Sequence, residues 1–94
     1  MPEIKIKNYR FDAEKFDAYK EHLRKRLHGE DERPIEEREK ERTKLHDELL
    51  ETCQPKDSFN MVPLKARYAL KDYIDAQLGF DVSFFLAYRE MFGI

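Results

Sequence analysis

Four basic side chains, Lys20, Arg24, Lys25 and His28, are the first candidates for chemistry in this sequence. Lys20, Arg24 and His28 are four residues apart, so on a helix they share one face and could hold phosphate groups. However, cations near the C-terminal end of a helix stabilise the helix dipole by themselves, and a bound anion would meet the negative end of that dipole. We therefore expect a solvated basic face, with phosphate or nucleic-acid binding as the alternative.

His46 and the single cysteine, Cys53, are the other residues whose types could support chemistry. A metal site built from nitrogen and sulfur needs three or four ligands at set spacings, and the sequence has no Cys-x-x-Cys or His-Glu-x-x-His pattern. A nucleophilic thiol needs a nearby base. Two helical turns would separate these side chains by roughly 10 Å of rise. We expect no metal, no cofactor and no catalysis by this chain, and Cys53 to be a small buried residue at a helix end.

The C-terminal segment is the most informative part of the sequence. Ten of the fifteen residues from 80 to 94 are apolar, and within the expected helix only Ser83, Arg89 and Glu90 form a polar face. A helix that is apolar on most sides must be buried on most sides, and in a short chain a second molecule can supply part of that burial. Aromatic residues and methionine are enriched in interface cores. The predicted interface residues are Phe80, Phe84, Phe85, Tyr88, Met91 and Phe92. The alternative is that this helix is ordinary core.

Charge is distributed unevenly along the chain. Residues 1–28 carry eight Lys/Arg against five Asp/Glu, whereas residues 29–53 carry five against ten. A dipolar chain suits an oppositely charged partner or a second copy, while a dedicated nucleic-acid binder is usually basic overall. We expect the front half of the helix over 34–53 to project partly from the core and to steer a partner electrostatically. The predicted steering residues are Glu36, Glu37, Arg38, Lys40 and Glu41.

Helix-boundary residues predict four helices that must position these groups. Aspartate suits an N-cap, proline the first turn, and glycine the position after a helix end. The residues at such positions are Asp12, Gly29, Pro34, Pro63, Gly79, Asp81 and Gly93. The predicted helices span residues 12–28, 34–53, 63–78 and 81–92.

The N-terminal residues 1–10 form an extended arm in this prediction. Ile4 and Ile6 alternate with Lys5 and Lys7 within residues 3–9, a period of two that is typical of a strand. We find no second strand in the sequence to pair with it. The arm therefore either packs on the helices, which we favour, or pairs with the sheet edge of a copy or a partner.

The predicted fold is all-α: a small four-helix bundle with two longer helices, one medium and one short, and an extended N-terminal arm that could form a short β-strand. Ninety-four residues make a single domain over 1–94, and 40% of them are charged, against about 25% in a typical globular chain. A domain of this size buries only about 60–65% of its unfolded surface, so association would add useful burial. The sequence has no signal-peptide core and no membrane-spanning apolar run, so we expect a cytoplasmic protein.

These features predict a non-enzymatic protein-interaction module: a regulator, adaptor, inhibitor or small subunit. Its aromatic C-terminal helix would bind a protein partner or a second copy of the chain, with no role for a membrane. One alternative is a small nucleic-acid- or phosphate-binding protein that uses the basic end of the first helix. Another is an accessory helical subunit of an enzyme complex whose chemistry lies in a different chain.

Overall fold

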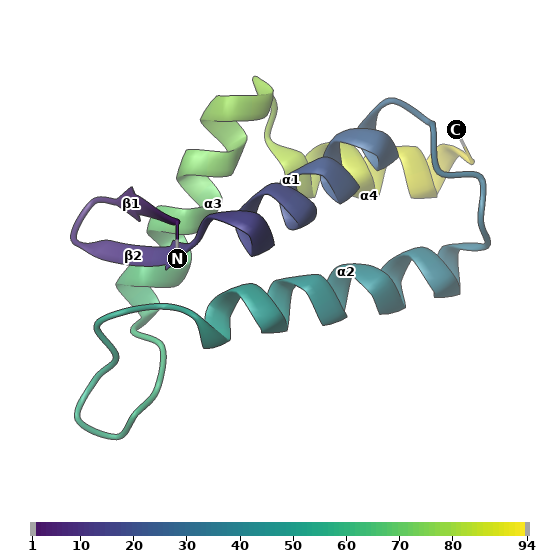
Figure 1. The fold of residues 1–94 in the computed structure, drawn as a ribbon. Coiled ribbons are helices and arrows are strands. Elements are labelled where there is room, and N and C mark those ends of the chain that lie inside the picture. The colour runs from purple at the N-terminus through teal and green to yellow at the C-terminus, as the bar shows by residue number, and fades with distance from the viewer. Residues whose placement is uncertain (1, 94) are drawn as a thin grey trace.

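The computed structural model describes residues 2–93, which form a two-stranded antiparallel sheet followed by four helices (Figure 1). The strands are β1 (Glu3–Ile6) and β2 (Tyr9–Asp12), and the helices are α1 (Ala13–Leu27), α2 (Ile35–Glu51), α3 (Leu64–Leu78) and α4 (Val82–Phe92). The predicted fold class, a small helical bundle with an N-terminal strand arm, is confirmed. Each predicted helix is present, with boundaries within two residues of those expected.

The sequence prediction was wrong in finding no partner for the first strand. Residues 9–12 form that partner, and Ile6 pairs with Tyr9 across a two-residue loop of Lys7 and Asn8. Lys7 adopts a left-handed conformation with φ of 54°. Two-residue hairpin loops need such a conformation and usually place glycine or asparagine there. Because lysine occupies the position, the usual sequence signal of a hairpin is missing.

The hairpin is fixed to the end of α2 by backbone pairing. Arg10 N donates to Gln54 O at 2.8 Å, and Gln54 N donates back to Arg10 O at 2.9 Å. The amide of Asp12 donates to Thr52 Oγ1 at 3.0 Å. The arm is thus an integral part of the fold, and it places Ile6 and Phe11 in the core.

The predicted caps define the helix ends. The side chain of Asp12 accepts from Lys15 N at 2.9 Å at the start of α1, and that of Asp81 accepts from Phe84 N at 3.2 Å at the start of α4. Gly79 ends α3 in the left-handed conformation, with φ of 73°, which glycine adopts without steric cost.

An apolar core joins the hairpin, the inner face of α1, the end of α2, the inner face of α3 and the start of α4. Cys53 is free and fully buried within it, and burial raises the pKa of its thiol. The core residues are Ile6, Phe11, Phe16, Tyr19, Leu23, Leu49, Leu50, Cys53, Ala66, Ala69, Leu70, Ile74 and Val82.

At the other end of α1, charged side chains replace this apolar packing. The Arg26 side chain is only 1% exposed, and its Nη2 lies 2.8 Å from Glu39 Oε1 of α2 and 2.5 Å from Glu90 Oε1 of α4. The front half of α2, which we expected to project, therefore runs beside α1 and is tied to it by a buried guanidinium (Figure 1). One arginine links three helices.

Candidate functional site

The C-terminal helix α4 contacts the rest of the molecule along one narrow face. Val82 is buried and Leu86 is partly buried against the core. The carboxylate of Asp75 in α3 accepts from Val82 N at 3.2 Å, and Arg26 holds Glu90. These contacts fix the orientation of α4 and leave its opposite side uncovered in this chain.

The uncovered side of α4 carries large apolar side chains. Met91 is 77% exposed, Phe84 64%, Phe92 63%, Tyr88 44% and Phe85 38%. At about 100° per residue, these five positions fall within a single arc of about 120°. We call the surface formed by these five residues and Phe80 the aromatic face.

Contacts between rings within the chain order the aromatic face. The ring of Phe85 lies 4.8 Å from that of Phe80 and 6.0 Å from that of Phe84, both nearly edge-to-face. Tyr88 and Phe92 form a second pair at 4.8 Å. Such pairs are favourable in themselves, so the face is partly preorganised.

All six residues predicted as an interface thus lie together on one surface. Phe80 extends it towards the end of α1, where its ring lies 6.4 Å from that of His28. The alternative, that α4 is ordinary core, holds only for its inner side: Val82 is buried, whereas Phe84 and Met91 face outward.

The four basic residues predicted as a phosphate site point to different surroundings in the fold. Lys20 Nζ turns to α3 and donates to a glutamine side-chain oxygen at 3.3 Å. Arg24 is engaged by two carboxylates, at 2.7 Å from Glu21 and 2.9 Å from Glu30. Its hydrogen bonds hold the pKa of both carboxyls below their usual value. Lys25 is exposed, and His28 lies against the aromatic face.

The predicted steering residues divide into free and engaged groups. Glu36, Glu37 and Lys40 are exposed. Arg38 lines a surface hollow between the start of α2 and the end of α4, and Glu41 pairs with an arginine of the linker. The charged front of α2 therefore lies beside the end of α4 that carries Met91 and Phe92 (Figure 1).

His46 lies beside Tyr19 at a groove on the surface of the molecule. Its ring packs against Tyr19 with centroids 5.3 Å apart, and both line a surface groove of about 320 Å³ beside α3. Burial lowers the pKa of His46. Neither His46 nor Cys53 belongs to the group of metal-type ligands found within residues 2–93.

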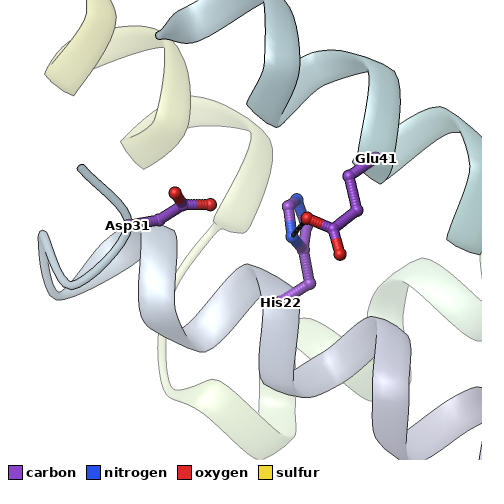
Figure 2. Close-up of side chains that lie close together, drawn as sticks. All are labelled: His22, Asp31 and Glu41. Atoms are coloured by element: carbon purple, nitrogen blue, oxygen red, sulfur yellow. Dashed lines mark ion pairs between the residues drawn. The ribbon is translucent and has the colours of Figure 1, made fainter. Parts of the chain in front are cut away.

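That group is a cluster which the sequence analysis did not predict: His22 of α1, Asp31 of the linker and Glu41 of α2 (Figure 2). One potential ligand atom from each residue lies within 4.8 Å of the others. His22 Nδ1 is 3.7 Å from Glu41 Oε2. Arg33 donates to both Asp31 oxygens, at 2.8 and 2.6 Å, and also contacts Glu41.

The surroundings of the cluster shift the pKa values of two of its groups, His22 and Asp31. Burial lowers the pKa of His22, which favours the neutral imidazole. Hydrogen bonds from Arg33 hold the pKa of the Asp31 carboxyl well below its usual range. His22 Nε2 is buried and has no hydrogen-bond partner among the described residues.

A sequence signal for part of this cluster existed. His22 and Arg26 follow Tyr19 and Leu23 at spacings of three, which places them on the face that turns inward. The position of Asp31 could not be predicted in this way, because it depends on the path of the linker between α1 and α2.

No protein-family model, curated protein or solved structure matches this chain. Within residues 2–93, each helix falls short of the length or the apolar character that crossing a membrane would require. A functional assignment for this chain must therefore be built from the geometry of the aromatic face and of the cluster around His22.

Proposed function

We propose that this chain is a non-enzymatic protein-interaction module of the cytoplasm, and that it binds a protein partner through the aromatic face of α4. The observation that carries the proposal is the presence of five large apolar side chains, each 38–77% exposed, on one side of a single helix. Monomeric proteins rarely expose contiguous apolar surface of this kind unless a partner covers it.

The geometry of the face defines what the partner must offer. Phe84, Met91 and Phe92 project furthest and are suited to insert into an apolar groove, whereas Phe85 is braced by its neighbours. Buried aromatic anchors of this type dominate the energetics of many interfaces. Glu36, Glu37 and Lys40 lie near the same end of the molecule and would orient the approaching partner through long-range charge.

The test is affinity capture from a lysate of the native host after nuclease treatment, with the retained proteins identified by mass spectrometry. We compare the wild-type chain with the double variant Phe84→Ser/Met91→Ser. The matched control is Phe59→Ser/Met61→Ser, because these side chains are also apolar and exposed, at 84% and 59%, but lie on the loop before α3.

We expect one stoichiometric protein that the wild type and the loop control retain and the α4 variant loses. The proposal fails if the α4 variant keeps the same partner, or if every retained protein disappears with nuclease. Sedimentation analysis of the purified chain distinguishes a second copy from a different protein. If the partner is a second copy, the purified wild type self-associates, and this self-association depends on Phe84 and Met91.

The proposed module could act as a regulator, an adaptor, an inhibitor or a subunit of an enzyme complex. The identity of the captured protein distinguishes these roles. The phosphate-binding alternative has less support, because Arg24 is already neutralised by Glu21 and Glu30.

A further inference from the structure

A second feature of the molecule, independent of the aromatic face, is the cluster formed where the linker crosses between α1 and α2. His22, Asp31 and Glu41 come from three successive segments and lie close together (Figure 2). They line one surface hollow, and Arg33 lines the same hollow. We propose that these three side chains bind one divalent transition-metal ion of the zinc type, and that Arg33 occupies the site in the absence of metal.

The distances are suited to a metal after a small adjustment. The three ligand atoms lie within 4.8 Å of one another. Ligands at zinc–nitrogen and zinc–oxygen distances in a tetrahedron are about 3.3 Å apart. Asp31 belongs to the linker rather than to a helix, so a shift there of up to about 1.5 Å closes the site with little movement of α1 against α2.

The state of His22 is the second, independent observation that points to a ligand. Its side chain is only 5% exposed, yet Nδ1 lies 3.7 Å from Glu41, beyond hydrogen-bond distance, and Nε2 is unpartnered among the described residues. Buried polar groups in folded proteins nearly always have a partner. Nδ1 is the ring nitrogen that lies nearest to Glu41, so a metal ion bound through Nδ1 would give this buried, uncommitted imidazole a partner.

The donor types select the class of ion. Imidazole nitrogen favours zinc and neighbouring transition metals, whereas magnesium and calcium prefer oxygen ligands alone. Two carboxylates and a neutral imidazole balance the charge of a divalent ion. Three protein ligands leave a fourth position for water.

Without a metal, the positive charge of Arg33 offsets the repulsion between the carboxylates of Asp31 and Glu41. Its guanidinium donates to Asp31 and contacts Glu41, and its side chain is 45% exposed on the linker. The positively charged guanidinium repels a divalent ion held by the same two carboxylates, so Arg33 competes with the metal for this site. Removing the guanidinium should therefore strengthen metal binding rather than weaken it.

The experiment is isothermal titration calorimetry of the full chain with zinc chloride in a non-chelating buffer, with magnesium chloride as the comparison. We expect one zinc ion per chain and no binding of magnesium at the same concentrations. Arg33→Gln should tighten zinc binding about tenfold, and His22→Gln and Asp31→Asn should each weaken it about tenfold or more. His46→Gln, which alters a histidine outside the cluster, should leave it unchanged.

Circular dichroism shows whether each variant keeps its helices. If His22→Gln fails to fold, Asp31→Asn still tests the site through its linker ligand. The inference is overturned if neither the wild type nor Arg33→Gln binds zinc. It is equally overturned if zinc binds with the same affinity to folded His22→Gln or Asp31→Asn, because the ion would then lie elsewhere.

Discussion

The two ends of the α1–α2 pair are held together by different forces. At the end next to the hairpin, Phe11, Phe16 and Leu49 are almost completely buried in an apolar core. At the opposite end, Arg26 is just as deeply buried but bonds two carboxylates, and His22 lies beside it on α1. The same pair of helices thus changes from apolar to ionic packing along its length.

This difference explains why α4 can present aromatic residues to the outside. The ionic end holds α4 through Glu90, while two inward residues of α4, Val82 and Leu86, pack against the apolar core. The larger side chains of α4 are not used for this attachment and point outward. At this end of the molecule, charged side chains are therefore buried and aromatic rings are exposed.

The largest effect is expected at the apolar end. Leu49→Ala should lower the free energy of unfolding by about 2–5 kcal/mol, because Leu49 is fully buried and its removal leaves a cavity. Urea unfolding followed by circular dichroism measures this change. A loss below 1 kcal/mol would show that the core is much looser than the structure indicates.

A smaller effect is expected from the ionic end. Arg26→Met should cost about 1–2 kcal/mol, since methionine keeps much of the apolar packing and the carboxylates of Glu39 and Glu90 are 40% and 30% exposed and can regain water. Hydrogen exchange should show α4 losing protection before the core does. A cost equal to that of Leu49→Ala would mean that the ion pairs stabilise this end as strongly as apolar packing does the other.

The ionic end should also respond to pH through His22. Burial, reinforced by Arg26 and Arg33 and opposed by Glu41 and Asp31, holds the pKa of His22 below its ordinary value. The unfolded chain therefore takes up this proton first as the pH falls. The contribution of the neutral imidazole is complete above about pH 6.5, the unfolded value, and is lost as the pH falls towards the folded pKa.

The measurement for this prediction is the urea midpoint at pH 7.5 and at pH 5.5. The wild type should lose more stability on acidification than His22→Gln does. His28→Gln is the matched control, because His28 is an exposed histidine directly after the same helix. An equal loss of stability on acidification in the wild type and in His22→Gln would show that His22 does not cause this pH dependence.

The helices could be predicted from the sequence because their ends are encoded locally. Asp12 and Asp81 accept from backbone amides within three residues, and Gly79 ends α3 by its own conformation. The hairpin was missed because Lys7 stands where glycine is usual. Its stability depends on Gln54, far along the chain, which no local pattern reveals.

The two candidate sites differ in the same way: one is encoded by local sequence and the other by contacts between distant segments. The aromatic face was predictable because all of its residues except Phe80 belong to one helix and repeat with helical spacing. The burial of Arg26 and the convergence of His22, Asp31 and Glu41 depend on how three segments meet in space. A charged residue such as Arg26 is normally assigned to the surface, and only its ion pairs in the folded chain explain its burial.

The most direct test of the account is the equilibrium unfolding of the Phe84→Ser/Met91→Ser variant. Both side chains are mostly exposed, so we predict a free energy of unfolding within about 0.5 kcal/mol of the wild type, even though the partner is lost. A loss comparable to that of Leu49→Ala would contradict the account, because the aromatic face would then stabilise the fold of the chain itself.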